Sequence, residues 1–145
     1  MFQHILLATD GSDASRRAVR MAVGLAREHG ARLTAVYVVD PYPYLGLGEA
    51  NPMGFEAYMA AALDHAAAAH EEVLAACGGE RQVELHWRRV EDAAAVKGIV
   101  DTAATVGADL VVVGSHGRSG LQRLMLGSVA GHVVAQAAVP VLVAR

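Results

Sequence analysis

Residues 110–134 read LVVVGSHGRSGLQRLMLGSVAGHVV, and this stretch decides how the rest of the chain is interpreted. It opens with the apolar run Leu110–Val113, which is typical of a strand buried on both faces of a parallel sheet. Glycine then recurs at every third position over Gly114–Gly120. A new apolar-periodic segment begins at Gly127–Ser128. The pattern predicts a buried strand, a glycine-rich loop and a helix.

Such a loop between a strand and a helix is suited to binding an anion. Glycine lets backbone N–H groups turn toward a ligand, and a helix N-terminus adds unpaired amides and the positive end of its dipole. We therefore predict a phosphate site made of Gly114–Ser119 and Gly127–Ala130 at the carboxyl end of a strand. Arg118 and Arg123 would supply positive charge, and Ser128 a hydroxyl group. The alternative is a long connection whose glycines serve backbone geometry alone.

Strand-like and helix-like segments alternate along the whole chain. The order predicts an α/β fold with one open, five-stranded parallel sheet and helices on both faces. We expect residues 1–145 to form a single domain. The expected strands are Gln3–Thr9, Arg32–Val39, Gln82–Val90, Leu110–Val113 and Val139–Ala144, and the expected helices are Ala14–His29, Phe55–Cys77, a helix capped by Asp92 and ending before Gly107, and Ser128–Ala137.

Details of these elements follow from the local sequence. Ser12 or Asp13 is placed to cap the first helix, whose core-facing stripe is predicted as Ala18, Met21, Ala22 and Leu25. Pro41–Gly54 is rich in Pro and Gly, and a loop of this length is often a lid or a partner surface.

Composition narrows the functional classes. The net charge is −3, with no long basic run, so nucleic acid is not the expected partner. No run approaches the roughly 18 apolar residues of a membrane span. The chain begins directly with a strand-like segment and has one cysteine, Cys77, so we expect a cytoplasmic protein without a signal peptide, with an inert thiol.

Several common sites are absent from the sequence. There is no GxxxxGK[ST] phosphate loop and no GxGxxG after the first strand, so Asp40 alone cannot support a dinucleotide site. His65 and His70 are five residues apart and would not share a helix face, so we do not expect a protein metal site. Ser115 and His116 could be mistaken for a nucleophile and base, but adjacent residues rarely point at each other.

The spacing Gly114-x2-Gly117-x9-Gly127-Ser128 resembles the nucleotide-binding signature of the universal stress protein family, in its ATP-binding branch. The segments Ile5–Ser12, Val36–Asp40 and Pro140–Ala144 resemble the family's first, second and last strands. The resemblance implies the strand order 3-2-1-4-5, which would place Asp10 and Gly114 in one crevice.

The resemblance also implies a ligand and the residues around it. The implied cofactor is ATP, and a Mg²⁺ or Mn²⁺ ion carried on its phosphates is compatible with the site. Val38 would offer backbone hydrogen bonds to the adenine. The residues implied to border adenine and ribose are Ala8, Thr9, Asp10 and Val38; those on the phosphate side are Gly114, Ser115, His116, Gly117, Arg118, Ser119, Gly127, Ser128, Val129 and Ala130. From the residues alone, Asp10 can also be interpreted as a helix-capping or turn aspartate.

The expected function is that of a nucleotide-dependent stress-response regulator or adaptor, acting on an unidentified protein partner. The last strand, Val139–Ala144, would be an apolar edge guarded only by Pro140, and the resemblance implies a homodimer joined through it. One alternative is a slow ATPase or autophosphorylating phosphotransfer enzyme that uses Asp10 and a divalent metal. Another is a structural dimer whose pocket holds no ligand.

Overall fold

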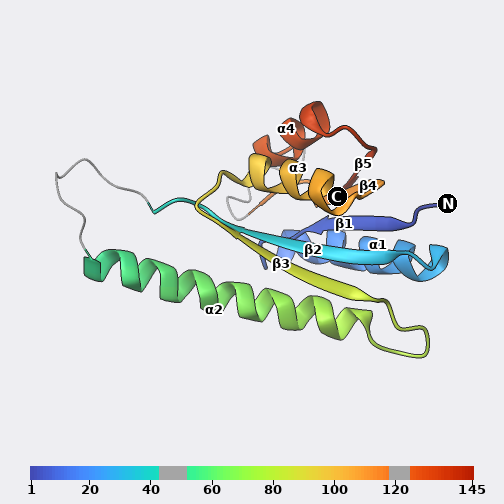
Figure 1. Ribbon diagram of the computed structural model, residues 1–145, viewed down its shortest axis with the longest axis horizontal. Helices are drawn as coiled ribbons and strands as arrows, with labels where there is room; N and C mark the ends of the chain where they lie inside the picture. The colour runs from blue at the N-terminus through green and yellow to red at the C-terminus, as the bar shows by residue number, and fades with distance from the viewer. Residues whose placement is uncertain (43–51, 118–124) are drawn as a thin grey trace.

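The computed structural model describes residues 1–42, 52–117 and 125–145 (Figure 1). Within these residues, parallel strands form a five-stranded sheet in the order β3-β2-β1-β4-β5. The predicted α/β fold and strand order are therefore confirmed. The strands are β1 (His4–Ala8), β2 (Arg32–Val39), β3 (Leu85–Glu91), β4 (Leu110–Gly114) and β5 (Val141–Ala144).

Helices cover both faces of the sheet: α1 (Asp13–His29), α2 (Pro52–Cys77), α3 (Ala95–Val106) and α4 (Ser128–Gln136). α1 and α2 pack on one face and α3 and α4 on the other, and Figure 1 shows α3 and α4 side by side. In the described part of the chain, no helix is long and apolar enough to span a membrane.

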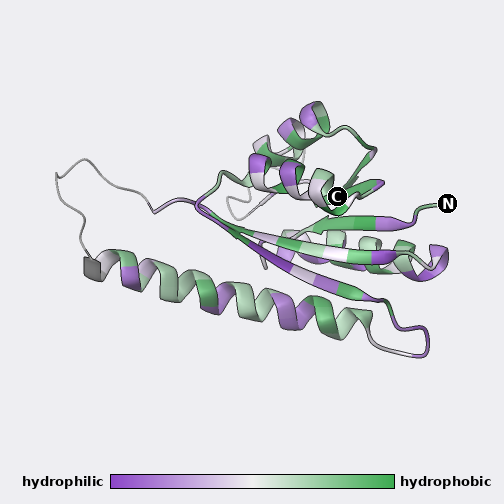
Figure 2. Cartoon of the chain, viewed as in Figure 1, coloured by the Kyte–Doolittle hydropathy of each residue, from purple (hydrophilic) through white to green (hydrophobic). Residues whose placement is uncertain are grey.

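The central strands are apolar on both faces because each face carries a helical layer. On β1, Ile5 and Leu7 belong to the core under α1, whereas Leu6 belongs to the core under α3 and α4. All three side chains are completely buried, and each contributes about 1.5–3 kcal/mol of hydrophobic stabilisation. Figure 2 shows the consequence: β1 is largely hydrophobic, whereas the edge strand β3 alternates between hydrophilic and hydrophobic residues.

The first helix is capped as predicted, but one residue of its predicted core stripe is wrong. The side chain of Ser12 accepts a hydrogen bond from the Ser15 N–H. Met21 is 47% exposed, while the helix buries its small residues against the sheet. Small side chains allow the helix to lie close to the sheet, so the face of α1 that carries them is the buried one. The buried residues are Ser15, Ala18, Val19, Ala22, Val23 and Ala26.

Three other predicted boundaries are corrected. α2 begins at Pro52, inside the predicted Pro41–Gly54 loop, because proline suits the first helical turn, where its missing N–H is not needed. β3 begins at Leu85, which pairs with Leu33, and not at Gln82. β5 begins at Val141, two residues after the predicted start. Residues 43–51 of the predicted loop lie outside the described residues.

The predicted capping role of Asp92 is also wrong. α3 starts at Ala95 with Ala94 at its N-cap position and no side-chain cap. Asp92 instead has a positive φ of 54°, a conformation that aspartate tolerates better than most residues. The chain turns at Asp92 and reaches helical geometry only later. The predicted end of the helix at Gly107 is confirmed.

His4 is a polar residue inside the sheet. It is 6% exposed, and its Nε2 lies 2.7 Å from Oγ1 of the buried Thr34. Burial, reinforced by the nearby positive charges of Arg32 and His86, lowers the pKa of His4 below its ordinary value of 6.5.

We predict that His4 makes the protein less stable under mildly acidic conditions. The unfolded chain takes up the proton at higher pH than the native protein does. The free energy of unfolding therefore falls as the pH drops below about 6.5 toward the lowered native pKa, with a slope from His4 of at most about 1.4 kcal/mol per pH unit. Urea denaturation between about pH 5.5 and pH 7.5 measures it. His4→Gln should show a shallower slope, since the other histidines are common to both proteins; equal slopes would contradict the prediction.

Candidate functional site

A cavity of about 870 Å³ lies at the carboxyl ends of β1, β2 and β4. Arg118 and Ser119, as well as Arg123, lie outside the described residues. Every other predicted site residue lines this cavity: Ala8, Thr9, Asp10, Val38, Gly114, Ser115, His116, Gly117, Gly127, Ser128, Val129 and Ala130. Two described segments, one on each side of residues 118–124 in the sequence, thus face one space.

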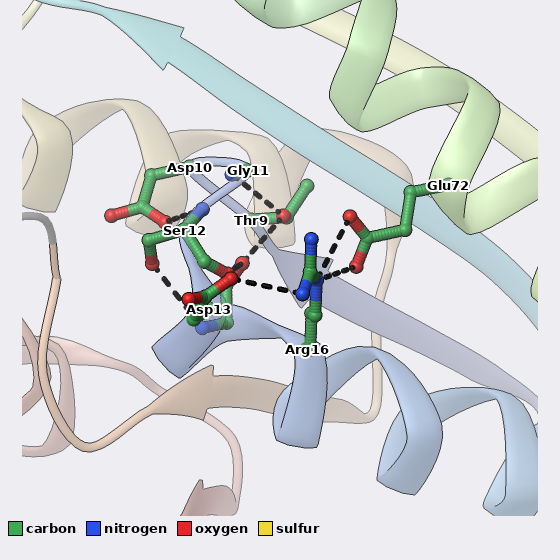
Figure 3. Close-up of polar contacts among 8 residues, drawn as sticks. Thr9, Asp10, Gly11, Ser12, Asp13, Arg16 and Glu72 are labelled. Atoms are coloured by element: carbon green, nitrogen blue, oxygen red, sulfur yellow. Dashed lines mark hydrogen bonds and ion pairs between the residues drawn. The ribbon is translucent and has the colours of Figure 1, made fainter.

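The turn after β1 is held by its own side chains (Figure 3). The Ser12 N–H donates to Oδ1 of Asp10 at 2.9 Å, and the Gly11 N–H donates to Oγ1 of Thr9 at 3.2 Å. Gly11 has a φ of 74°, which favours glycine. Oγ1 of Thr9 in turn donates to Oγ of the buried Ser15, which also lines the cavity. This network fixes Asp10 at the cavity edge.

A glycine is required where the loop after β4 meets the start of α4. A Cβ atom added to Gly127 would lie 2.7 Å from the Ser115 carbonyl oxygen, closer than real Cβ atoms approach. The Gly127 N–H donates to that same oxygen at 2.7 Å. Gly117 is close to the β1 turn, since its Cβ would lie 3.2 Å from Oδ2 of Asp10. These contacts hold the two predicted segments together.

Two of the helices that begin at this edge of the sheet, α1 and α4, have different N-termini. The first turn of α1 is capped by the Ser12 side chain. α4 has Gly127 at its N-cap position and no side-chain cap, and its first residues line the cavity. Helix N-terminal amides need an external partner, and the helix dipole favours a negative one. The start of α4 can therefore bind an anionic group.

Ser115 and His116 interact, contrary to the expectation that these neighbours would not point at each other. Oγ of Ser115 lies 3.0 Å from Nδ1 of His116. The chain bends at Ser115, whose N–H still donates to the Ala144 carbonyl of β5. Nε2 of His116 is buried and has no hydrogen-bond partner among the described residues. This atom is therefore available to a group in the cavity.

One wall of the cavity was not predicted from the sequence. It comes from α2 and the end of β2: Asp40, Tyr58, Ala61, Ala62 and His65 line it. The Tyr58 hydroxyl donates to the Asp40 carbonyl at 2.9 Å and ties α2 to the end of β2. The Ala-rich sequence of α2 gives little indication of which face lies on the sheet, so its lining residues could not be identified.

The histidines of α2 take separate positions. His65 lines the cavity, whereas His70 stacks on Trp87 with ring centroids 4.6 Å apart. No group of three metal-ligating side chains occurs among residues 1–42, 52–117 and 125–145. Cys77 is buried, and burial raises the pKa of its thiol.

Comparison with known proteins decides the family. The model of the universal stress protein family matches residues 1–145. The chain belongs to this family. A universal stress protein from Thermus aquaticus is 38% identical over 151 residues and is covered completely, as is this chain.

Two solved structures extend the family relationship to the fold. A universal stress protein from Lactobacillus plantarum is 30% identical with a TM-score of 0.82, over 99% of this chain and 97% of the other. A universal stress protein solved in complex with cAMP is 27% identical with a TM-score of 0.67, over 99% and 97% of the two chains.

We predict opposite effects of alanine at two glycines near the start of α4. Gly127→Ala should lower the free energy of unfolding by about 1–3 kcal/mol, because the new methyl group meets the Ser115 carbonyl. Gly131→Ala is the matched control. It lies inside α4, and its nearest neighbour would be 3.8 Å away, so it should raise stability by about 0.5–1 kcal/mol. Urea denaturation measures both, and changes of the same sign would contradict the assigned contact.

Proposed function

We propose that this universal stress protein binds ATP in the cavity at the β1/β4 crevice and acts as a nucleotide-dependent regulator or adaptor. The observation that carries the proposal is the uncapped N-terminus of α4, which faces a cavity whose other walls include Gly117 and Ser115. A cavity of about 870 Å³ is within the range of small-ligand sites. The solved relative in complex with cAMP supports an adenine nucleotide as the ligand class.

The two ends of the cavity suit the two ends of a nucleotide. Adenine and ribose would lie near Asp10 and the backbone of Val38, beside the apolar ends of β1 and β2. The phosphates would accept hydrogen bonds from the first amides of α4, from Ser128 and from Nε2 of His116, which is buried without a partner among the described residues.

The described lining residues carry too little positive charge to neutralise a triphosphate. Their acidic side chains are Asp10 and Asp40, and within that part of the chain no lysine or arginine lines the cavity. Backbone amides alone would offset a triphosphate only in part. We therefore propose that Arg118 and Arg123, or a Mg²⁺ or Mn²⁺ ion carried on the phosphates, supply the remaining positive charge.

We propose nucleotide binding rather than catalysis as the role of this site. The Asp10 carboxylate accepts the Ser12 N–H and stabilises the β1 turn, which gives it a structural role. Bound nucleotide would brace β1, β4 and α4 together, and a protein partner in the cytoplasm could recognise that braced state.

We further propose that two copies pair through β5. The strand order leaves β5 with only β4 as a neighbour in the described sheet. The carbonyls of Pro140 and Ala144 accept hydrogen bonds from the N–H groups of Val111, in β4, and Ser115, which follows it. Since alternate residues point the same way along a strand, the N–H groups of Val141 and Val143 point to the open edge. A second β5 can satisfy them.

We predict that the protein binds ATP and that Gly127→Val weakens the binding. The valine side chain would displace Ser115 and the start of α4, so affinity should fall by at least about tenfold. Titration with a fluorescent ATP analogue measures the affinity, and mass spectrometry of nucleotide released by denaturation tests for bound ligand.

Gly24→Val is the matched control for this test, because a Cβ at Gly24 of α1 would meet nothing within 4 Å. It should bind like the unmodified protein. Normal ATP binding by Gly127→Val would refute the site assignment, and the absence of saturable binding by the unmodified protein would refute the function.

We predict a dimer in solution at about tens of micromolar, dissociated by Val143→Pro. Proline removes an N–H that points to the open edge, while the bonds between β4 and β5 remain. Light scattering should give twice the 15.1 kDa chain mass for the unmodified protein and the single mass for the variant. A monomer mass for the unmodified protein would contradict the proposed pairing.

A further inference from the structure

A second concave site lies on the other side of α3 from the nucleotide cavity. It is a groove of about 950 Å³ between α3 and the strands β2 and β3. None of its described lining residues is shared with the cavity at the β1/β4 crevice. Its chemistry is therefore independent of the proposed nucleotide site.

The groove exists because the helical layer does not extend over the edge strand. α3 packs on β2 at Gly98, where an added Cβ would lie 2.7 Å from a methyl group of Val38. On β3, the side chains at 86 and 88 are His and Arg, opposite Thr34 and Val36. Both are exposed, in accordance with the hydrophilic segments on β3 in Figure 2. The outer part of this face is thus a polar floor beside a helix wall.

Most charges that line the groove are already paired. Lys97 lies 2.6 Å from Asp101, and Arg89 lies 2.9 Å from Glu91. Two guanidinium groups remain: in the described part of the chain, Arg32 and Arg88 have no ion pair. The protein as a whole carries a net charge of −3, so this excess of positive charge is local.

The two arginines are spaced to act together. Arg88 is opposite Val36, four residues beyond Arg32 on β2, so their Cα atoms are about 14 Å apart. Thr34 and His86 lie between them. Two long side chains can converge on one ligand across this span, and each guanidinium can form bidentate bonds to a phosphate or carboxylate.

The floor of the groove also includes buried polar groups. His4 and Thr34 are 6% and 1% exposed and contact each other through Nε2 and Oγ1. Burial lowers the pKa of His4, and the nearby Arg32 guanidinium lowers it further, so His4 can report on charge that is added to the groove.

We propose that this groove is a binding site for a small polyanion, held by Arg32 and Arg88 at its two ends. The ligand carries at least two phosphate or carboxylate groups. Its negative charge offsets the two unpaired guanidiniums, and its size is bounded by the groove.

The test uses the complete protein and two probes, inorganic tripolyphosphate and citrate, at constant ionic strength. The ring signals of His4, assigned with His4→Gln, are followed by NMR. A bound anion reverses the repulsion from Arg32 and His86, so the pKa of His4 should rise saturably. A response to tripolyphosphate alone identifies a phosphate ligand, and a response to citrate alone a carboxylate ligand; a response to both identifies a general polyanion site.

Variants separate this groove from other sites. Arg32→Gln and Arg88→Gln should each raise the dissociation constant of the bound probe by at least about tenfold. Arg20→Gln, an exposed arginine of α1 on the opposite face, should leave it unchanged. The proposal is overturned if neither probe shifts His4, or if the shift persists unchanged in Arg88→Gln. Probe binding at the nucleotide cavity would give that second result.

Discussion

The parallel pairing of β1 with β4 is the constraint on which the rest of the structure depends. Ile5, Leu6 and Leu7 lie opposite Leu110, Val111 and Val112, and the chain leaves the two strands toward opposite faces of the sheet. α1 follows β1 on one face, and α4 lies on the other. Because the chain diverges from the two strands in this way, a crevice opens between their carboxyl ends. The apolar runs that form the strands thus also create the space for a ligand.

A crevice becomes a shaped site only when its walls are fixed, and here backbone contacts fix them. The Gly127 N–H and the Ser115 carbonyl meet at 2.7 Å, so the start of α4 is held against the end of β4. The opposite wall is held by the side chains of Thr9, Asp10 and Ser12 within one turn. The residues that form both walls have short side chains. Short side chains allow the main chain to come close to a bound ligand.

The sequence could predict those parts of the molecule that local chemistry determines. Apolar runs such as Leu110–Val113 specify buried strands, and Ser12 specifies a helix cap; both predictions are confirmed. The wrong prediction for Asp92 shows where local sequence is not sufficient. The geometry of the turn before α3 depends on the path that the chain takes from β3 to the helix.

The residues that line the cavity likewise include some that the sequence could predict and some that it could not. The spacing of glycines predicted the lining residues after β4. His65 and Tyr58 could not be predicted in this way, because they come from α2, whose many alanines are compatible with several packing faces. Such residues become identifiable only when the tertiary contacts are known. The contact between Ser115 and His116 was likewise missed, since it depends on a turn and not on the spacing of residues.

Helix α3 lies between the two concave sites and makes a close contact with β2 at Gly98. Val38 lines the cavity proposed to bind nucleotide, and its methyl groups abut Gly98, which lines the groove proposed to bind a polyanion. Only a residue without a side chain lets the helix lie this close to β2. A larger residue at 98 would push α3 away from the sheet, which would widen the groove and move the Ala95 and Ile99 wall of the cavity together. The distance between α3 and β2 therefore sets the dimensions of both sites, and the missing side chain of Gly98 sets that distance.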